Sequence, residues 1–317
     1  MSQVRILTIC VSCFLCLFGF SVESSADENK DVPVDFCLED NWIDSAYCRF
    51  HYSIDNSANS LNDMFKVHPD VDDPATTRGR LRFGWEPRTG NLAEFDFRFR
   101  IRLKLPAFEN RVELLLSDDE DDINRQDVKA ARRDEFNNSN KPVLALQFKT
   151  KEDDKISYRL GFGRGSQLYT RTRYTDVYKI DEKIHLFYFA EANYYSEDKL
   201  GFEFNGVLGI ELNETSGVEF NNSFRFRDPS DDWYWRHEFQ YLLLKDDSAS
   251  YLYTASIEGV TRPNYRKEQM FMSVRYKQKF LREWLFIELE PYVLWLRKED
   301  FRASLGMAVR FEVHFET

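Results

Sequence analysis

The chain has 317 residues and a mass of 37.8 kDa, which suffices for two average soluble domains or one large barrel and excludes a small disulfide-stapled fold. Lys and Arg number 43 against 54 Asp and Glu, and this net charge of -11 argues against a protein whose main partner is nucleic acid. The chain is 16% aromatic, yet 31% of its residues are charged. A sheet with one lipid-facing side and one polar side needs both kinds of residue.

Residues 1–26 have the features of a cleaved secretory signal peptide. Arg5 precedes an uncharged apolar run of about 15 residues. Ser24, Ser25 and Ala26 are the small residues at which a signal peptidase cuts. The run is short for a spanning helix, which needs about 20 residues. The sequence therefore predicts an exported chain that begins near Asp27.

Residues 27–77 form a small N-terminal element in this interpretation. Cys37 and Cys48 remain after cleavage, and an even pair of cysteines in an oxidising compartment indicates a disulfide. Apolar residues then recur at helical spacing from Trp42 to Phe65, which predicts an amphipathic helix of about five or six turns. The element is either a periplasmic cap packed under the main domain or a plug within it, and we favour the cap.

From residue 78 onward the hydrophobic period changes to two. Between Glu94 and Leu105 six apolar residues alternate with six charged ones, so one face is apolar and the other is ionic. A barrel wall between lipid and water needs this alternation over about ten residues. Similar segments number fourteen and lie at residues 80–86, 92–105, 110–117, 142–149, 155–164, 168–180, 183–195, 199–212, 216–227, 233–244, 250–260, 269–280, 284–296 and 301–315.

Two further patterns agree with a barrel of this size. With an even strand count, tight turns fall at one end, and the long connections at 118–141 and 261–268 fall at the other. Aromatic residues of a membrane girdle are expected at the ends of strands: Trp85, Tyr194, Tyr195, Trp233, Trp235 and Trp295. Asp176 on a lipid-facing phase and Pro291 within a strand fit poorly, so a twelve-strand barrel is the alternative.

The leader, the alternation, the girdles and the aromatic final strand resemble Gram-negative outer-membrane β-barrel proteins over residues 78–317. The final strand is similar to the C-terminal signal that the barrel-assembly machinery reads in such proteins, although Glu316 and Thr317 follow where a terminal Phe is usual. The predicted fold is all-β: a transmembrane antiparallel up-and-down β-barrel of about 14 strands after a short helical segment. The resemblance implies the bacterial cell outer membrane, with lipid and lipopolysaccharide around the barrel.

The polar phase places many charged side chains in the lumen. The basic ones lie on early and late strands, which closure makes neighbours, and the acidic ones lie on the middle strands. Opposed arcs of this kind would set a transverse field across a pore, whereas cross-strand pairing would neutralise the same charges. The basic arc comprises Arg80, Arg82, Arg98, Arg100, Arg102, Lys104, Arg159, Arg171, Arg173, Arg275, Lys277, Arg302 and Arg310, and the acidic arc comprises Glu191, Glu203, Glu211, Glu219, Glu238 and Glu258.

The connection at 118–141 opens with an acidic run. Loops of this length are functional or disordered. We expect a solvated loop, while folding inward to narrow a pore and binding a divalent cation outside are the alternatives. The run lacks the alternating ligands and turn glycine of an EF-hand loop, so no metal site is predicted. Its acidic residues are Asp118, Asp119, Glu120, Asp121 and Asp122.

Three functions from different classes fit this sequence. A porin-like channel for small polar or charged solutes is favoured by the charged inner phase. A non-transporting envelope barrel with a filled lumen is the second, favoured by bulky Phe187 and Phe271 on that phase. An outer-membrane hydrolase is the third, but no nucleophile elbow or zinc-protease motif accompanies the five histidines, so we expect no enzyme and no cofactor.

We predict a disulfide between Cys37 and Cys48. Closing a loop of about 12 residues should stabilise the N-terminal element by about 3 kcal/mol at most and should leave the barrel unaffected. The mass shift on alkylation, measured with and without reductant, reports the bond. Free thiols in protein isolated from the envelope would contradict it.

Overall fold

A computed structural model describes residues 41–65, 74–108, 111–118, 128–132, 143–151, 153–163 and 167–316. Fourteen antiparallel strands make one closed barrel, as predicted, in preference to twelve. The strands are β1 (Thr76–Trp85), β2 (Phe95–Leu105), β3 (Val112–Ser117), β4 (Val143–Lys149), β5 (Ile156–Gly163), β6 (Gln167–Lys179), β7 (Ile184–Tyr195), β8 (Lys199–Asn213), β9 (Ser216–Arg227), β10 (Asp232–Asp246), β11 (Ala249–Val260), β12 (Arg266–Phe280), β13 (Arg282–Leu296) and β14 (Ala303–Glu316).

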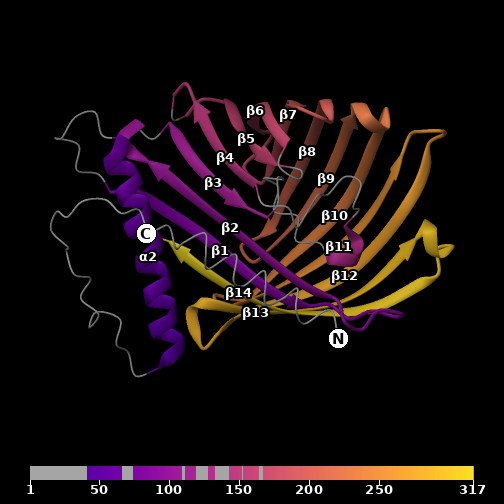
Figure 1. Cartoon of the computed structure of the whole chain (residues 1–317). Coiled ribbons are helices and arrows are strands. Elements are labelled where there is room, and N and C mark those ends of the chain that lie inside the picture. The colour runs from indigo at the N-terminus through magenta and orange to yellow at the C-terminus, as the bar shows by residue number, and fades with distance from the viewer. Residues whose placement is uncertain are drawn as a thin grey trace, which may run out of the picture. The chain divides into compact units, whose positions relative to one another are not determined.

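Each strand pairs with its neighbours in sequence, and β1 pairs with β14 to close the sheet (Figure 1). The closing register sets Leu81 opposite Val313 and Gly84 opposite Arg310. Tight connections lie at the end where β1 begins and β14 finishes, which we call the turn end. The other end, which carries the long connection after β3, is the loop end. In outer-membrane barrels short turns face the periplasm.

The wall of the barrel is apolar outside and ionic inside. Phe83 and Phe97 are 52% and 53% exposed, whereas Arg82 and Asp96, one residue away, are each 2% exposed. This arrangement reverses that of a soluble protein, because hydrocarbon rather than water is the outer solvent. The alternation predicted from the sequence therefore has the correct phase.

Asp176 does face outward, near the turn end of β6, and its neighbours satisfy it. Lys155 Nζ lies 2.8 Å from Asp176 Oδ2. The hydroxyls of Tyr174 and Tyr188 donate to the same oxygen at 3.0 and 3.2 Å. A carboxylate at the lipid-facing surface is thus tolerated because a cation and two tyrosine hydroxyls surround it.

Pro291 also has a local explanation. On one side it is paired by register with Met307 of β14. On the other side, the β12 to β13 ladder is interrupted between the pairs Ser273–Tyr292 and Tyr276–Leu289. The N–H that proline lacks therefore falls where the ladder is already broken.

The assignment of Tyr195 to the aromatic girdle is wrong. Tyr194 is 47% exposed on the outer face, but Tyr195 is buried in the lumen, with its ring stacked on that of Tyr169 at 5.0 Å. Adjacent residues of a strand point to opposite faces, so only one of the two tyrosines can belong to the girdle.

The predicted N-terminal helix is α2 (Trp42–Phe65). The side chain of Asn41 accepts a hydrogen bond of 3.0 Å from the Ile43 N–H, which caps its first turn. No helix of the described ranges is long and apolar enough to cross a bilayer. Cys37 lies outside the described residues, so the disulfide stays a prediction, as does the assignment of residues 27–77 to a cap.

We predict that a charge is tolerated on the inner phase of β2 and not on its outer phase. Phe99→Arg places a cation against lipid and should cost about 2 to 4 kcal/mol near the bilayer midplane, whereas Arg100→Glu keeps an ion in the lumen. Heat-modifiable gel mobility after refolding in detergent measures both variants. Equal folding of the two would refute the assigned phase.

Candidate functional site

A cluster of buried ions lies on the inner face where β13 and β14 meet β1. Arg310 and Glu290 have side chains with no exposed surface, and they contact each other. Arg310 Nε lies 2.6 Å from Glu86 Oε1. Arg275 donates to both carboxylate oxygens of Glu290, at 3.0 and 3.1 Å. Pairing of this quality is what permits such charges to leave water.

Asp96 is the centre of a second cluster. Its Oδ2 lies 3.2 Å from Arg82 Nη2 and 3.2 Å from Arg98 Nε. A third guanidinium, that of Arg132, reaches the same oxygen at 2.6 Å. Arg132 belongs to the long connection between β3 and β4, so this carboxylate ties that connection to the barrel wall.

The middle strands carry arginines among their acids. Arg225 donates to both oxygens of Glu203, at 3.0 and 3.1 Å. Arg236 contacts Glu238 and lies 3.3 Å from Glu258. Of the two alternatives, cross-strand pairing and opposed arcs of charge, these contacts favour pairing for most of the acids on the middle strands. Arg171 and Arg173 likewise flank Glu191, at 3.4 and 2.5 Å.

Nearly all the charged residues assigned to the lumen lie on inner strand positions. Arg302 is the exception, because it lies in the connection before β14. Further buried charged residues were not assigned to the lumen from the sequence: Glu86, Glu288, Glu290, Glu312, Arg225, Arg227, Arg236 and Arg132. All but Glu86 and Arg132 follow from extending the same alternation along their strands, whereas those two lie in connections.

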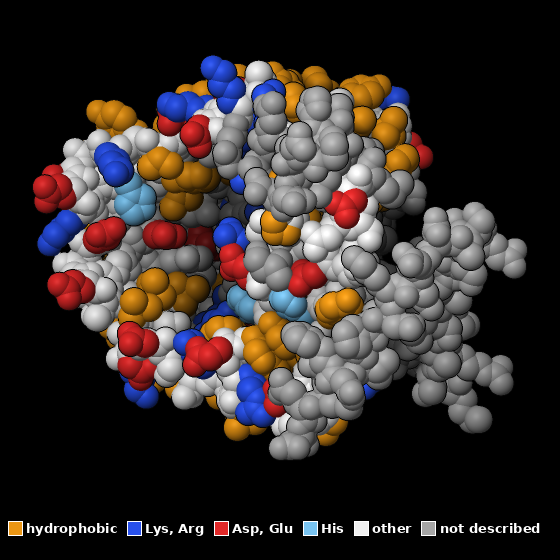
Figure 2. All heavy atoms as spheres, turned by 90° about the vertical axis from the view of Figure 1, so that its left-hand side faces the viewer, with side chains coloured by type: hydrophobic (Ala, Val, Ile, Leu, Met, Phe, Trp, Pro, Cys, Tyr) orange, Lys and Arg blue, Asp and Glu red, His pale blue; other side chains and the backbone are white. Residues whose placement is uncertain are grey.

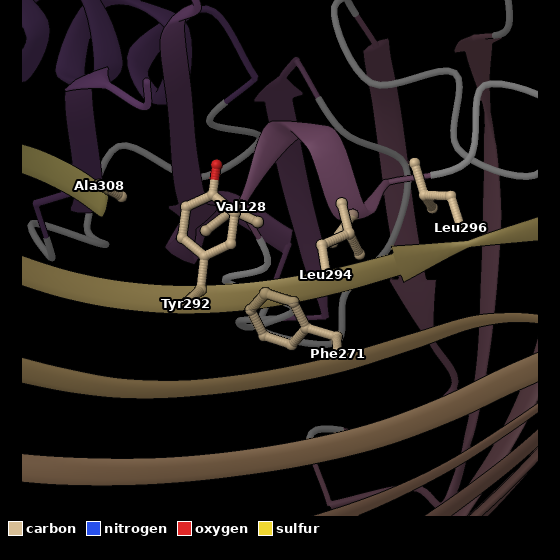
Figure 3. Close-up of a cluster of buried hydrophobic side chains, with 7 residues drawn as sticks. Val128, Phe271, Tyr292, Leu294, Leu296 and Ala308 are labelled. Atoms are coloured by element: carbon tan, nitrogen blue, oxygen red, sulfur yellow. The ribbon is translucent and has the colours of Figure 1, made fainter. Parts of the chain in front are cut away.

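Part of the long connection folds into the lumen, which corrects the expected solvated loop. Val128 and Ala131 are 0% and 2% exposed and belong to a buried cluster on the inner wall (Figure 3). The cluster comprises Val128, Ala131, Phe271, Tyr292, Leu294, Leu296 and Ala308. Asp118 is buried at the loop end of β3, where its Oδ1 accepts a bond of 3.0 Å from the Phe99 N–H. Asp119, Glu120, Asp121 and Asp122 lie outside the described residues.

Polar contacts hold this inward segment, residues 128–132, in place. The Lys129 N–H donates to Glu86 Oε2 at 2.5 Å. Gln269 Nε2 donates to the Ala131 carbonyl at 2.7 Å. Together with Arg132 and Asp96, these contacts attach the segment to β2, β12 and the end of β1. The segment therefore occupies part of the lumen cross-section.

The described residues enclose cavities in the lumen toward the turn end, and two of these are charged. The larger of the two, about 720 Å³, is lined by residues of β7 to β12 and by the turn between β8 and β9. The smaller, about 430 Å³, is lined by residues of β2 and of β4 to β8 and by the connection before β5. Val207 lines both, so the cavities adjoin. Figure 2 shows this end of the barrel, where acidic and basic side chains surround a hollow.

Four histidines lie in the described ranges: His51, His185, His237 and His314. His185 lines the larger cavity. His237 faces outward, with Nδ1 2.7 Å from Asn222 Oδ1. His314 contacts Glu312 on β14. Within the described ranges, no group of three or more His, Cys, Asp or Glu side chains is arranged to hold a metal ion.

A closed up-and-down barrel with an apolar exterior and an ionic interior defines the class: the chain is a β-barrel of the bacterial outer membrane. No protein-family model matches it, and no curated protein resembles it in sequence.

Several solved structures resemble the barrel in fold at low sequence identity. The channel DcaP of Acinetobacter baumannii is 6% identical with a TM-score of 0.44, over 76% of this chain and 96% of that chain. OccK11 of Pseudomonas aeruginosa is 8% identical with a TM-score of 0.42, over 77% and 96%. OmpT of Vibrio cholerae is 8% identical with a TM-score of 0.45, over 76% and 98%. These likenesses concern the fold.

We predict that Arg310→Met strongly destabilises the barrel. The change removes the shared partner of Glu86 and Glu290 and should cost about 3 to 5 kcal/mol. The matched control is Arg78→Met, because Arg78 pairs with Glu316 while 70% exposed and should contribute at most about 1 kcal/mol. Urea unfolding in detergent, followed by tryptophan fluorescence, compares the two. Equal midpoints would show that the buried cluster contributes no more than a surface pair.

Proposed function

We propose that this barrel is a porin-like channel for small polar or charged solutes. The observation that carries the proposal is the pair of charge-lined cavities in the turn-end half of the lumen. A barrel of fourteen strands falls between small barrels filled by side chains and porins of about 16 strands with aqueous channels. Charged side chains around an aqueous path select among ions and orient polar solutes.

The inward segment 128–132 supplies the constriction of this channel. It lies against the inner wall of β12 to β14 through the buried apolar cluster. It is attached by hydrogen bonds and ion pairs, and its chain is not part of the barrel ladder. A constriction of this kind sets the size limit of a pore independently of the strand number.

The alternative is a non-transporting envelope barrel with a filled lumen. It is favoured by the buried ion clusters, in which the side chains of Arg310, Glu288 and Glu290 have no exposed surface. Such clusters block part of the cross-section permanently. The two functions differ in one measurable quantity, the conductance.

The remaining expectations belong to the same proposal. Residues 1–26 would direct export, and the barrel-assembly machinery would insert the barrel by reading its final strand. That strand presents apolar side chains outward at alternate positions. Those on the lipid-facing surface include Leu305, Met307 and Phe311, which are 62%, 43% and 41% exposed.

We predict that expelling the inward segment raises the conductance. Val128→Asp combined with Ala131→Asp buries two carboxylates in an apolar contact, which favours release of the segment while the strand ladder is kept. Single-channel conductance in a planar bilayer compares the double variant with wild type and with Lys129→Gln, a control that leaves the apolar contact intact. Zero conductance in wild type and double variant alike would remove the channel and leave the filled barrel.

A further inference from the structure

The larger cavity has a net negative lining. Among the described residues that line it, four are acids (Glu211, Glu214, Glu219 and Glu238) and one is a base (Arg275), so these side chains sum to a net charge of -3. Glu238 is held by Arg236, and Arg275 is held by Glu290. Within the described part of the chain, Glu211, Glu214 and Glu219 form no ion pair, so the negative field is carried by these three.

The smaller cavity has the opposite sign. Among the described residues, Arg102, Lys149 and Arg173 line it together with Asp154, so three bases oppose one acid and these side chains sum to a net charge of +2. Lys155 also lines it, but its ammonium contacts Asp176 on the outer face of the barrel. Arg173 is also paired with Glu191, a carboxylate outside the lining, which makes this the weaker field. Two adjoining cavities of opposite sign form a dipolar vestibule.

An amide pair lies at the junction of the two cavities. Asn205 lines the basic cavity and Asn221 lines the acidic one. Asn205 Nδ2 donates to Asn221 Oδ1 at 2.8 Å across β8 and β9. Asn205 is only 5% exposed, yet its Oδ1 has no hydrogen-bond partner among the described residues. A buried amide oxygen without a donor is costly unless a ligand supplies one.

We propose that this vestibule is a binding site for zwitterionic peptides of a few residues. This proposal rests on the proposed channel function and names the class of solute. The ammonium end of such a peptide is attracted to Glu211 and Glu219, and its carboxylate end to the basic cavity. The peptide N–H between these ends matches the unpaired oxygen of Asn205. A purely anionic or cationic solute gains from one cavity and is repelled by the other.

The test compares two probes of similar size, both with an amide. Glycylglycine carries both charges, and N-acetylglycinamide carries none. Proteoliposomes with wild-type protein should swell faster in isosmotic glycylglycine by about fivefold, the factor that one favourable charge contact in water supplies. Glu211→Gln combined with Glu219→Gln should reduce this ratio to about one. Asn205→Ser should lower the ratio without changing any charge.

The control is Glu182→Gln, which removes a charge from the turn end outside both cavities and should keep the wild-type ratio. Heat-modifiable gel mobility reports whether each variant is folded. If the Glu211→Gln, Glu219→Gln double variant does not fold, Asn205→Ser alone tests the peptide site. If wild-type proteoliposomes swell at about the same rate in both probes, the peptide site is overturned and the proposed channel function stands. If the proteoliposomes swell in neither glycylglycine nor N-acetylglycinamide, both the peptide site and the channel are overturned.

Discussion

The pairing of β1 with β14 is the constraint on which the rest of the molecule depends. Hydrocarbon offers no hydrogen bonds to an open sheet edge, so the sheet can enter a membrane only if the first and last strands pair with each other. Closure then fixes the neighbours in the lumen. It sets Arg310 opposite Gly84, where a Cβ would lie 3.1 Å from Arg310 Cγ, and brings the guanidinium to Glu86. A side chain at residue 84 would therefore require Arg310 to shift by a few tenths of an ångström at the point where the ring is joined.

Burial of the lumen charges follows from this closed geometry. A wall whose outer face must be apolar has only its inner face for polar side chains, and these crowd together over β12 to β2. Most of the cations there are arginines, whose planar forks bind carboxylates at two points, as Arg275 binds Glu290. Lysine at such a position would leave one carboxylate oxygen without its donor.

Strand number, strand phase and most inner residues could be predicted from the sequence, because alternation is a local property. Arg225 and Glu203 have the correct phase and could be paired from hairpin register alone. The contact of Arg310 with Glu86 depends on closure, and that of Arg132 with Asp96 depends on the path of a long connection. No periodicity encodes either contact. For the same reason the acidic start of that connection gave no sign that Val128 and Ala131 pack inside.

The outward contact between Asp176 and Lys155 limits how deeply the barrel is immersed. Displacing the barrel along the membrane normal toward the loop end would draw this ion pair into hydrocarbon, where charge is heavily penalised. The tyrosines beside it prefer the headgroup level and oppose movement in either direction. The preferred hydrophobic thickness of the bilayer therefore equals the distance, along the membrane normal, from the Asp176–Lys155 pair to the aromatic girdle at the loop end. A thinner or thicker membrane would have to deform locally around this side of the barrel.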